Sequence, residues 1–368
     1  MRKTILAGLR CKESEEVWLQ KTDELRRLCV ACGCEICGEV YQKADRAQSR
    51  TLIGTGKCQQ LREIAEEQKA ELIVFLNDLS GIQNRNLEEL TGFEVADRSA
   101  VILEIFDINA KTRQARLQVE AARLSYQLPR LIDGQLHFDQ QQGGGVRNRG
   151  AGETRLERSR RVIEKKIKAI RTELDQLKVQ QRIQSQRRRK SGIPLVCLIG
   201  YSNAGKSSLM NLLLKRLNNS EQKQVEVRDQ LFATLDSFTR RIEISPGHPI
   251  LLSDTVGFVR DLPDFLLEAF ETTLQQITGA DCLLEVIDIS DPQWQVQHEI
   301  VTETLRRLNS LQIPRILVYN KCDRNQTAER CDGVMISCMR QSGISELVEV
   351  LKENLGIENP QMNENDEF

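Results

Sequence analysis

Short apolar runs alternate with amphipathic stretches along the first part of the chain, from Lys3 to about Ala110. The short runs at residues 4–9, 38–41, 71–77 and 100–106 predict strands. The stretches between them place apolar residues three or four positions apart, which predicts helices. This alternation predicts a small α/β domain over residues 1–109.

From residue 110 the pattern becomes helical. Leu117, Ala121, Leu124 and Leu128 are spaced four, three and four residues apart. We expect one helix over residues 110–131, interrupted at Pro129, because proline cannot donate the backbone hydrogen bond of a helix interior.

A glycine-rich stretch at residues 143–152 should not hold regular structure. A long charged helix follows, in which one narrow apolar seam repeats in heptad fashion. The seam residues are Ile163, Ile167, Ile170, Leu174 and Leu177. The 110–131 helix is the natural partner for this seam, so residues 110–192 are predicted to form an antiparallel helical hairpin.

Strand and helix patterns alternate again after Pro194. Strands are predicted at residues 195–199, near 241, and at 250–253, 282–287, 315–319 and 334–336. Helices are predicted from residue 206 and at 264–277, 293–310 and 344–354. This order predicts an α/β domain with a mostly parallel sheet over residues 193–356, followed by an acidic tail at 357–368.

Charge is distributed unevenly between these parts. The whole chain of 368 residues has a net charge of −1. Residues 147–190 contain 16 Lys or Arg and 5 Asp or Glu, a net charge of +11, which leaves −12 for all other residues. A strongly basic segment on an acidic background indicates a polyanionic partner.

The overall composition is that of an ordinary globular protein, with 40% hydrophobic and 29% charged residues. No apolar run reaches the length of a membrane helix, so no membrane span is expected. The first ten residues look like a strand and not like a signal peptide, which makes the cytoplasm the expected location. We also expect a monomer in solution.

The 11 cysteines are scattered and odd in number, as is typical of reduced cytosolic thiols, so no structural disulfide is expected. Four of them form a C-x-x-C-x-C-x-x-C cluster at residues 29–37. Paired zinc knuckles usually need a longer loop between them. Small buried residues at a helix end and a strand are therefore favoured over a metal site, although the pattern leaves both open.

Residues 200–207 match the phosphate-binding loop G-x-x-x-x-G-K-[ST], directly after a predicted strand and at the start of a predicted helix. The loop consists of Gly200, Tyr201, Ser202, Asn203, Ala204, Gly205, Lys206 and Ser207. Its backbone N–H groups would surround the phosphates, and Lys206 would reach the terminal phosphates. The Ser207 hydroxyl would bind Mg²⁺.

The base site distinguishes GTP from ATP. Residues 320–323 match the N-K-x-D element of GTPases, and consist of Asn320, Lys321, Cys322 and Asp323. The Asp323 carboxylate can accept hydrogen bonds from two guanine donors that adenine lacks, while the stem of Lys321 covers the ring. The segment Ser337, Cys338 and Met339 follows the last predicted strand, where a backbone N–H could reach the guanine oxygen.

Two segments between these motifs have the positions of nucleotide switches. Asp254, Thr255, Val256 and Gly257 resemble the D-x-x-G element, in which the aspartate holds the Mg²⁺ hydration shell and the glycine N–H bonds the γ-phosphate. The first switch is expected at Phe232, Ala233, Thr234, Leu235 and Asp236. Thr234 is the candidate Mg²⁺ ligand there, with an ordinary turn threonine as the alternative.

The predicted catalytic groups are Lys206, Thr234, Gly257 and Asn203. Ras-like GTPases place a water-orienting glutamine directly after the D-x-x-G glycine, but Phe258 occupies this position. We therefore expect slow intrinsic hydrolysis, completed by a group from a partner or from elsewhere in the chain. Asn203 is a candidate K⁺ ligand over the phosphates, or equally a loop-forming residue.

These motifs together resemble the HflX family of GTPases, and the resemblance covers nearly the whole chain. Residues 232–236 are similar to the first switch of that family, and residues 143–153 resemble its G-G-G-x-G-x-R-G-P-G-E signature. Two positions depart from the signature: Arg147 stands where glycine is expected, and Ala151 where proline is expected.

The resemblance implies a cytoplasmic GTPase that binds ribosomes, chiefly the large subunit, and dissociates stalled or idle ones. Ribosomal RNA would then be the polyanion that the basic hairpin contacts. The candidate RNA-binding residues are Arg147, Arg149, Arg155, Arg158, Arg161 and Lys165. An RNA-binding switch in which hydrolysis is incidental remains the alternative to a hydrolytic enzyme, whereas Asp323 argues against an ATP-driven RNA remodeller.

Overall fold

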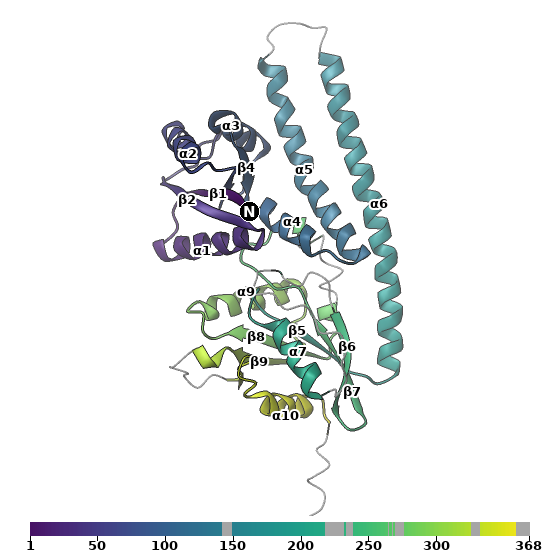
Figure 1. The fold of residues 1–368 in the computed structure, drawn as a ribbon. Coiled ribbons are helices and arrows are strands. Elements are labelled where there is room, and N and C mark those ends of the chain that lie inside the picture. The colour runs from purple at the N-terminus through teal and green to yellow at the C-terminus, as the bar shows by residue number, and fades with distance from the viewer. Residues whose placement is uncertain are drawn as a thin grey trace, which may run out of the picture. The chain divides into compact units, whose positions relative to one another are not determined.

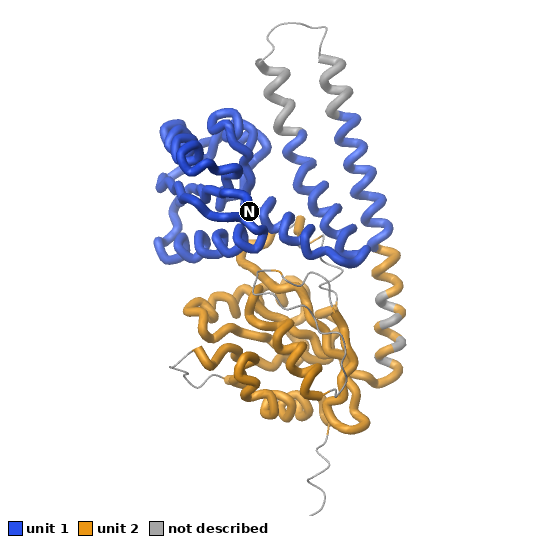
Figure 2. The backbone as a smooth tube through the Cα atoms, in the orientation of Figure 1, with its two compact units in different colours: residues 1–174 blue, residues 175–368 orange. Residues whose placement is uncertain are grey.

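The structure is a computed structural model that describes residues 1–141, 149–217, 232, 238–263, 265–266, 268, 276–324 and 332–357. Side chains are not described at residues 132–141, 149–156, 181, 182, 184, 187 and 189. The chain divides into two compact units, Met1–Leu174 and Asp175–Phe368 (Figure 2).

A four-stranded parallel sheet forms the centre of the first unit (Figure 1). The strand order is β2-β1-β3-β4. The strands are β1 (Arg2–Arg10), β2 (Cys34–Lys43), β3 (Leu72–Phe75) and β4 (Glu94–Asp97), and the helices are α1 (Glu15–Ala31), α2 (Thr55–Gln68), α3 (Gly81–Thr91) and α4 (Arg98–Asn109). The small α/β arrangement expected from the apolar runs is therefore present.

The strand predicted at residues 100–106 is wrong, because these residues lie in α4. The fourth strand, β4, precedes them and was not predicted. Asp97 begins the helix, since its side chain accepts a hydrogen bond from the Ala100 N–H at 2.9 Å. Val101, Ile102 and Leu103 are all buried. A short apolar run does not distinguish a buried helix from a buried strand.

The helical hairpin is formed by α5 (Arg113–Gln141) and α6 (Arg149–Lys190), which run antiparallel (Figure 1). Arg113 near the start of α5 pairs with Glu173 of α6 at 2.7 Å. Three of the five predicted seam residues, Ile167, Ile170 and Leu174, are buried.

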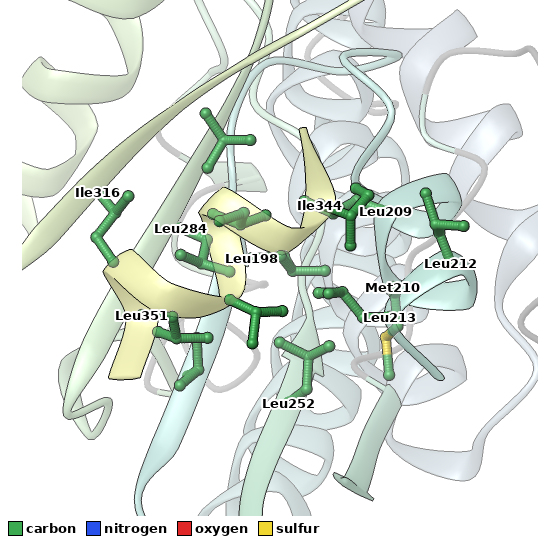
Figure 3. Packing of buried hydrophobic residues seen from close by; sticks show 14 of the residues in the cluster. Leu198, Leu209, Met210, Leu212, Leu213, Leu252, Leu284, Ile316, Ile344 and Leu351 are labelled. Carbon is green, nitrogen blue, oxygen red and sulfur yellow. The ribbon is translucent and has the colours of Figure 1, made fainter. Parts of the chain in front are cut away.

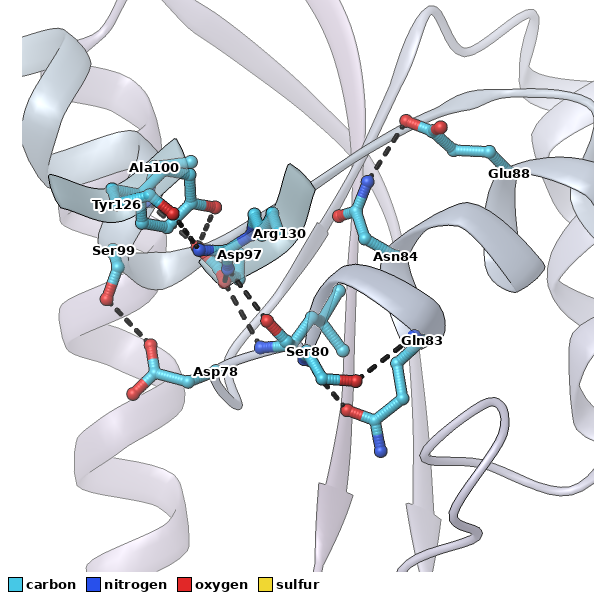
Figure 4. A network of polar contacts seen from close by, with 11 residues as sticks. Asp78, Ser80, Gln83, Asn84, Glu88, Asp97, Ser99, Ala100, Tyr126 and Arg130 are labelled. Carbon is cyan, nitrogen blue, oxygen red and sulfur yellow. Dashed lines mark hydrogen bonds and ion pairs between the residues drawn. The ribbon is translucent and has the colours of Figure 1, made fainter. Parts of the chain in front are cut away.

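Two expectations about the hairpin need correction. The α5 helix is not interrupted at Pro129 and does not stop near residue 131, but continues to Gln141. A polar network in the interior of α5 holds the chain there: Arg130 donates to the Leu79 carbonyl at 2.7 Å and pairs with Asp97 (Figure 4). The α6 helix begins at Arg149, inside the stretch expected to be irregular. Glycines cost little there because the first N–H groups of a helix have no intrahelical hydrogen-bond partner to lose.

The second unit has a six-stranded sheet with the order β10-β9-β8-β5-β7-β6, and only the β6–β7 pair is antiparallel. The strands are β5 (Leu195–Ile199), β6 (Phe238–Ser245), β7 (His248–Asp254), β8 (Cys282–Asp288), β9 (Arg315–Asn320) and β10 (Val334–Met335), and the helices are α7 (Lys206–Leu217), α9 (Trp294–Arg307) and α10 (Ile344–Asn354). The expected mostly parallel sheet is confirmed.

Apolar side chains cover both faces of this sheet. Leu209 and Leu213 of α7 and Leu351 of α10 pack with Leu198 and Leu252 on one face (Figure 3). A second cluster on the other face includes Val301 and Leu305 of α9. The loops at the carboxyl ends of the parallel strands are thereby held in place, where α/β sheets bind ligands.

Every cysteine in the described part of the chain is a free thiol. Among these same residues, no group of three or more metal-ligating side chains forms. In the cluster at residues 29–37, Cys29 and Cys34 are buried. Burial raises the pKa of the Cys29 and Cys32 thiols, which disfavours the thiolate that metals bind. None of the helices in the described ranges has the length and apolar composition needed to cross a bilayer.

Candidate nucleotide-binding site

The phosphate loop connects the end of β5 to the start of α7. Gly200 has φ +142°, and a Cβ there would lie 2.2 Å from the Val286 carbonyl oxygen. Gly205 has φ +101°, and a Cβ there would lie 2.2 Å from Nδ2 of Asn320. Any side chain at either position would both clash and strain the backbone, so the two motif glycines are required by the fold.

Lys206 lies inside this loop and is 6% exposed. Its Nζ donates to the carbonyl oxygens of Gly200 at 3.1 Å and Tyr201 at 2.9 Å. Burial lowers the pKa of Lys206 to about 8, against the opposing effect of the Asp254 carboxylate. Phosphate groups near Nζ would raise this pKa again, because an opposite charge favours the ammonium form.

Ser207 and Asp254 face each other across the loop. The Ser207 hydroxyl donates to Oδ2 of Asp254 at 2.6 Å, and Asp254 is fully buried at the end of β7. The next residue, Thr255, donates its hydroxyl to the Leu198 carbonyl at 2.6 Å, which holds the start of the D-x-x-G loop to β5. A hydroxyl and a carboxylate at this distance are hard oxygen donors, and they fit Mg²⁺.

The end of the D-x-x-G loop pairs with the phosphate loop through backbone hydrogen bonds. The Ser202 N–H donates to the Phe258 carbonyl at 2.7 Å, and the Phe258 N–H donates to the Gly200 carbonyl at 3.2 Å. A Cβ on Gly257 would lie 2.7 Å from Cα of Ser202 and 3.0 Å from Nζ of Lys206. The predicted phosphate-sensing glycine is therefore next to the predicted phosphate-binding lysine.

Phe258 places its ring in the core of the second unit. The side chain is 4% exposed and belongs to the apolar cluster with Cys197, Ile199 and Leu283. Its backbone lies at the nucleotide loops, but its side chain does not, so Phe258 has a structural role at the position where a glutamine was considered.

The base-site residues lie at the end of β9, beside the phosphate loop. Asn320 is buried and donates from Nδ2 to the Ala204 carbonyl at 2.9 Å. The Nζ of Lys321 donates to the Asn203 carbonyl at 3.1 Å and pairs with Asp288 at 2.6 Å. These contacts fix the lysine stem next to the phosphate loop, as a side chain that covers a base requires.

Asp323 accepts a hydrogen bond from the hydroxyl of buried Ser337 at 2.5 Å. This bond lowers the pKa of Asp323, so the carboxylate stays ionised and able to accept two donors. The Cys338 N–H donates to Oδ1 of Asn320 at 3.2 Å. The Cys338 N–H would have to break or share this hydrogen bond before it could donate to a guanine oxygen.

Several predicted site residues lie outside the described residues: Ala233, Thr234, Leu235, Asp236 and Arg147. Phe232 is described, and its N–H donates to Oγ of Ser202 at 2.7 Å. Arg149 and Arg155 lie in α6, but their side chains are not described. Arg158 and Lys165 are exposed on the same helix, and Arg161 pairs with Glu157.

Sequence analysis missed one residue of this site, Asp288, and assigned a different contact to another, Ser337. Asp288 anchors Lys321, and Ser337 orients Asp323 and also accepts the Arg340 N–H at 3.0 Å. The sequence signal that could have identified Asp288 is its position as an acidic residue at the end of a buried strand. Ser337 was predicted only for a backbone contact.

Known proteins match the chain along most of its length. Three family models follow one another: GTP-binding GTPase N-terminal over residues 20–107, GTP-binding GTPase middle region over 109–188, and 50S ribosome-binding GTPase over 195–321. A GTPase HflX from Caldanaerobacter subterraneus subsp. tengcongensis is 38% identical over 96% of this chain and 80% of its own length. A GTPase HflX from Escherichia coli K12 is 35% identical over 92% of this chain and 79% of its own length. The chain belongs to the HflX family of GTPases.

Solved structures resemble this HflX family member in fold. The crystal structure of SsGBP in complex with GDP has a TM-score of 0.53 at 22% identity, covering 97% of this chain and 99% of that chain. A GTP-binding protein from Sulfolobus solfataricus in complex with GDP has a TM-score of 0.50 at 21% identity, over 97% and 99% of the two chains. At this identity the likeness concerns the fold alone.

Proposed function

We propose that the protein binds and hydrolyses GTP and, as a guanine-nucleotide switch, associates with the large ribosomal subunit to split or rescue stalled or idle ribosomes. The observation that carries the nucleotide part is the ionised Asp323 carboxylate, oriented by Ser337 beside a complete phosphate loop. Family membership supports the same reaction. The proposal includes the cytoplasmic location and the monomeric state expected from the sequence.

Each residue has a defined task in this proposal. The loop amides and Lys206 bind the phosphates, whose negative charge would stabilise the ammonium form of Nζ against the effect of burial. Ser207, Asp254 and Thr234 would hold Mg²⁺, which supplies positive charge to the phosphate oxygens. The Gly257 N–H bonds the γ-phosphate. K⁺ at Asn203 stays a prediction.

The basic hairpin supports the ribosomal part of the proposal. Arg158 and Lys165 are exposed on α6, in a segment with a net charge of +11. Such a surface gains affinity for RNA by releasing counterions from the phosphates. The family model for the second unit is described as a 50S ribosome-binding GTPase.

A second candidate is an RNA-binding switch in which hydrolysis is incidental. The inward-facing ring of Phe258 favours it, because the ring provides no hydrogen bond to an attacking water. Ribosome release measured with GTP and with a non-hydrolysable analogue separates the two: equal release with both nucleotides indicates the incidental role.

The base site is tested by Asp323→Asn. We expect this variant to lose GTP affinity at least tenfold and to prefer xanthosine triphosphate, because an amide donates where the carboxylate accepted. Affinities are measured by fluorescence titration with labelled nucleotides. Asp332→Asn, the same change at an exposed carboxylate, is the control and should leave both affinities unchanged. Unchanged GTP preference in Asp323→Asn would show that guanine is bound elsewhere.

A further inference from the structure

Lys321, whose stem is expected to cover the base, has an unfavourable backbone conformation. Its φ is +62°, in the left-handed region that disfavours residues with a Cβ. Asn203, whose carbonyl accepts a hydrogen bond from Nζ of Lys321, has φ +66°. A lysine adopts this conformation only where surrounding contacts impose it, so the contacts of Lys321 decide whether its side chain is held at the nucleotide site.

Asp288 provides such a contact from the neighbouring strand. It is the last residue of β8 and lies opposite Asn320 of β9 in the parallel sheet. Its Oδ2 pairs with Nζ of Lys321 at 2.6 Å, and the two side chains are only 16% and 20% exposed. Water screens a partly buried ion pair less than a surface pair, so this contact is stronger than most exposed ion pairs.

The carboxylate of Asp288 is itself fixed in place. Its Oδ1 accepts the backbone N–H of Ser290 at 3.1 Å and the hydroxyl of the same residue at 2.6 Å. The N–H of Ile289, between them, donates to the Asn320 carbonyl at 3.1 Å and joins this loop to the end of β9. Both oxygens of the carboxylate therefore have partners, and the side chain cannot rotate away from Lys321 without losing the Ser290 bonds.

These contacts restrict the stem of Lys321 before any nucleotide binds. The ammonium group is held at two acceptors, Oδ2 of Asp288 and the Asn203 carbonyl, while the backbone is held at the end of β9. Few side-chain rotamers satisfy both ends. A long side chain that is already ordered loses little conformational entropy when a ligand packs on it, which favours binding.

We propose that Asp288 is a positioning residue for guanine nucleotides: through Lys321 it preforms the surface on which the base lies, and it thereby sets the affinity for GDP and GTP alike. The inference rests on the proposed function, because it takes residues 320–323 as the guanine site. Asp288 acts at the base end of the nucleotide. Its loss should therefore weaken diphosphate and triphosphate binding equally and leave the chemical step unchanged.

Asp288→Ala removes the charged partner of Lys321. Hydrogen bonds between charged groups are among the strong ones, so we expect GDP and a non-hydrolysable GTP analogue each to bind about tenfold more weakly, with their affinity ratio unchanged. The KM for GTP should rise by the same factor at an unchanged kcat. Fluorescence titration and steady-state hydrolysis measure these quantities. A lower kcat at an unchanged KM would indicate a loss of folded protein and would overturn the positioning role.

A conservative variant and a matched control accompany this measurement. Asp288→Asn keeps an acceptor of the same shape without its charge, and should restore part of the affinity, to about threefold below wild type. Asp291→Ala removes a carboxylate three residues further along the same loop. Asp291 accepts hydrogen bonds from the Gln293 N–H at 2.9 Å and from Gln297 at 2.8 Å, and its loss should change nucleotide affinity less than twofold.

A double-mutant cycle tests whether Asp288 acts through Lys321. Lys321→Met keeps an unbranched apolar stem and removes the ammonium group. In this background Asp288→Ala should lower nucleotide affinity less than twofold further, because the interaction that it removes is already absent. A second tenfold loss would show that Asp288 acts on the fold in general and would overturn the inference.

The inference and the proposed function fail in different ways. Unchanged GDP and GTP affinities in Asp288→Ala, with guanine preference still altered in Asp323→Asn, would overturn the role of Asp288 alone. If Asp323→Asn keeps its preference for guanine, the base is bound elsewhere, and the inference is overturned together with the base site on which it rests.

Discussion

At the scale of single residues, Phe258 shows how one position can have two separate roles. Its backbone N–H and carbonyl join the nucleotide loops, while its ring fills the core with Cys197, Ile199 and Leu283. The phenyl ring therefore occupies a space that an amide could not fill without burying unpaired polar atoms. The side chain of a glutamine at this position would point into the core and would not reach the nucleotide.

Phe258→Gln should accordingly lower the free energy of unfolding by about 3 kcal/mol and should not raise intrinsic GTP hydrolysis. Urea unfolding and single-turnover hydrolysis measure the two effects. Phe258→Leu keeps an apolar side chain and should cost about 1 kcal/mol, with the same hydrolysis rate. Faster hydrolysis in Phe258→Gln would mean that the side chain reaches the nucleotide after all.

At the scale of elements, a buried carboxylate connects α5 to the sheet of the first unit (Figure 4). Asp97 is fully buried and accepts hydrogen bonds from the Tyr126 hydroxyl at 2.8 Å and the Leu79 N–H at 3.1 Å, and it pairs with Arg130. Burial raises the pKa of Asp97 and Arg130 opposes this shift. A Cβ on Gly81 would lie 2.7 Å from the Arg130 backbone, so α3 and α5 are in close contact here.

Arg130→Met should destabilise the first unit by about 3 kcal/mol at pH 7, because it leaves a buried carboxylate without its positive partner. The pKa of Asp97 then rises further, and a raised acid pKa costs stability only where the group is ionised. The deficit relative to wild type should therefore shrink as the pH is lowered from 7 to 5.

Trp18 fluorescence in a Trp294→Phe background follows unfolding of the first unit, since the chain has two tryptophans, one in each unit. Arg123→Met is the control on the same helix. Arg123 forms a half-exposed pair with Asp107 at 3.0 Å, so this change should cost less than about 0.5 kcal/mol at either pH. A pH-independent deficit in Arg130→Met would assign the loss to packing alone.

At the scale of the whole molecule, the charge asymmetry is the dominant feature. A segment of net charge +11 belongs to a chain of net charge −1. The buried apolar residues of α6 lie on one narrow face of the helix. Basic residues elsewhere on the helix are exposed, among them Arg158, Lys165 and Lys168. A one-signed surface of this size repels itself unless a polyanion relieves the repulsion.

Reversing the charge at Arg155, Arg158, Arg161 and Lys165 should weaken binding to large ribosomal subunits and leave GTP affinity intact. If each residue contacts one phosphate, the slope of log affinity against log salt should fall by about 3. Co-sedimentation at several salt concentrations measures both quantities. The control reverses Lys12, Arg62 and Lys69 of the α/β domain; a larger effect there, with an unchanged arm variant, would move the contact to that domain.

The sequence alone determined the features that depend on residues close together in the chain. The motifs at residues 200–207 and 320–323 are recognised from local spacing alone, and the alternation of strands and helices after Pro194 predicted the sheet of the second unit. The heptad seam of α6 is local in the same sense, since its period follows from the helix itself.

Only the tertiary structure decided what depends on contacts between distant segments. Residues 100–106 are a helix because Asp97 caps it and the surroundings bury it on several sides, which an apolar run does not reveal. The chain continues through Pro129 where Arg130 meets Asp97, 33 residues away. Likewise, neighbours in space set the direction of the Phe258 ring and the contacts of Ser202 with Phe232 and Phe258. Periodicity reports the faces of an element, but not which other element will cover them.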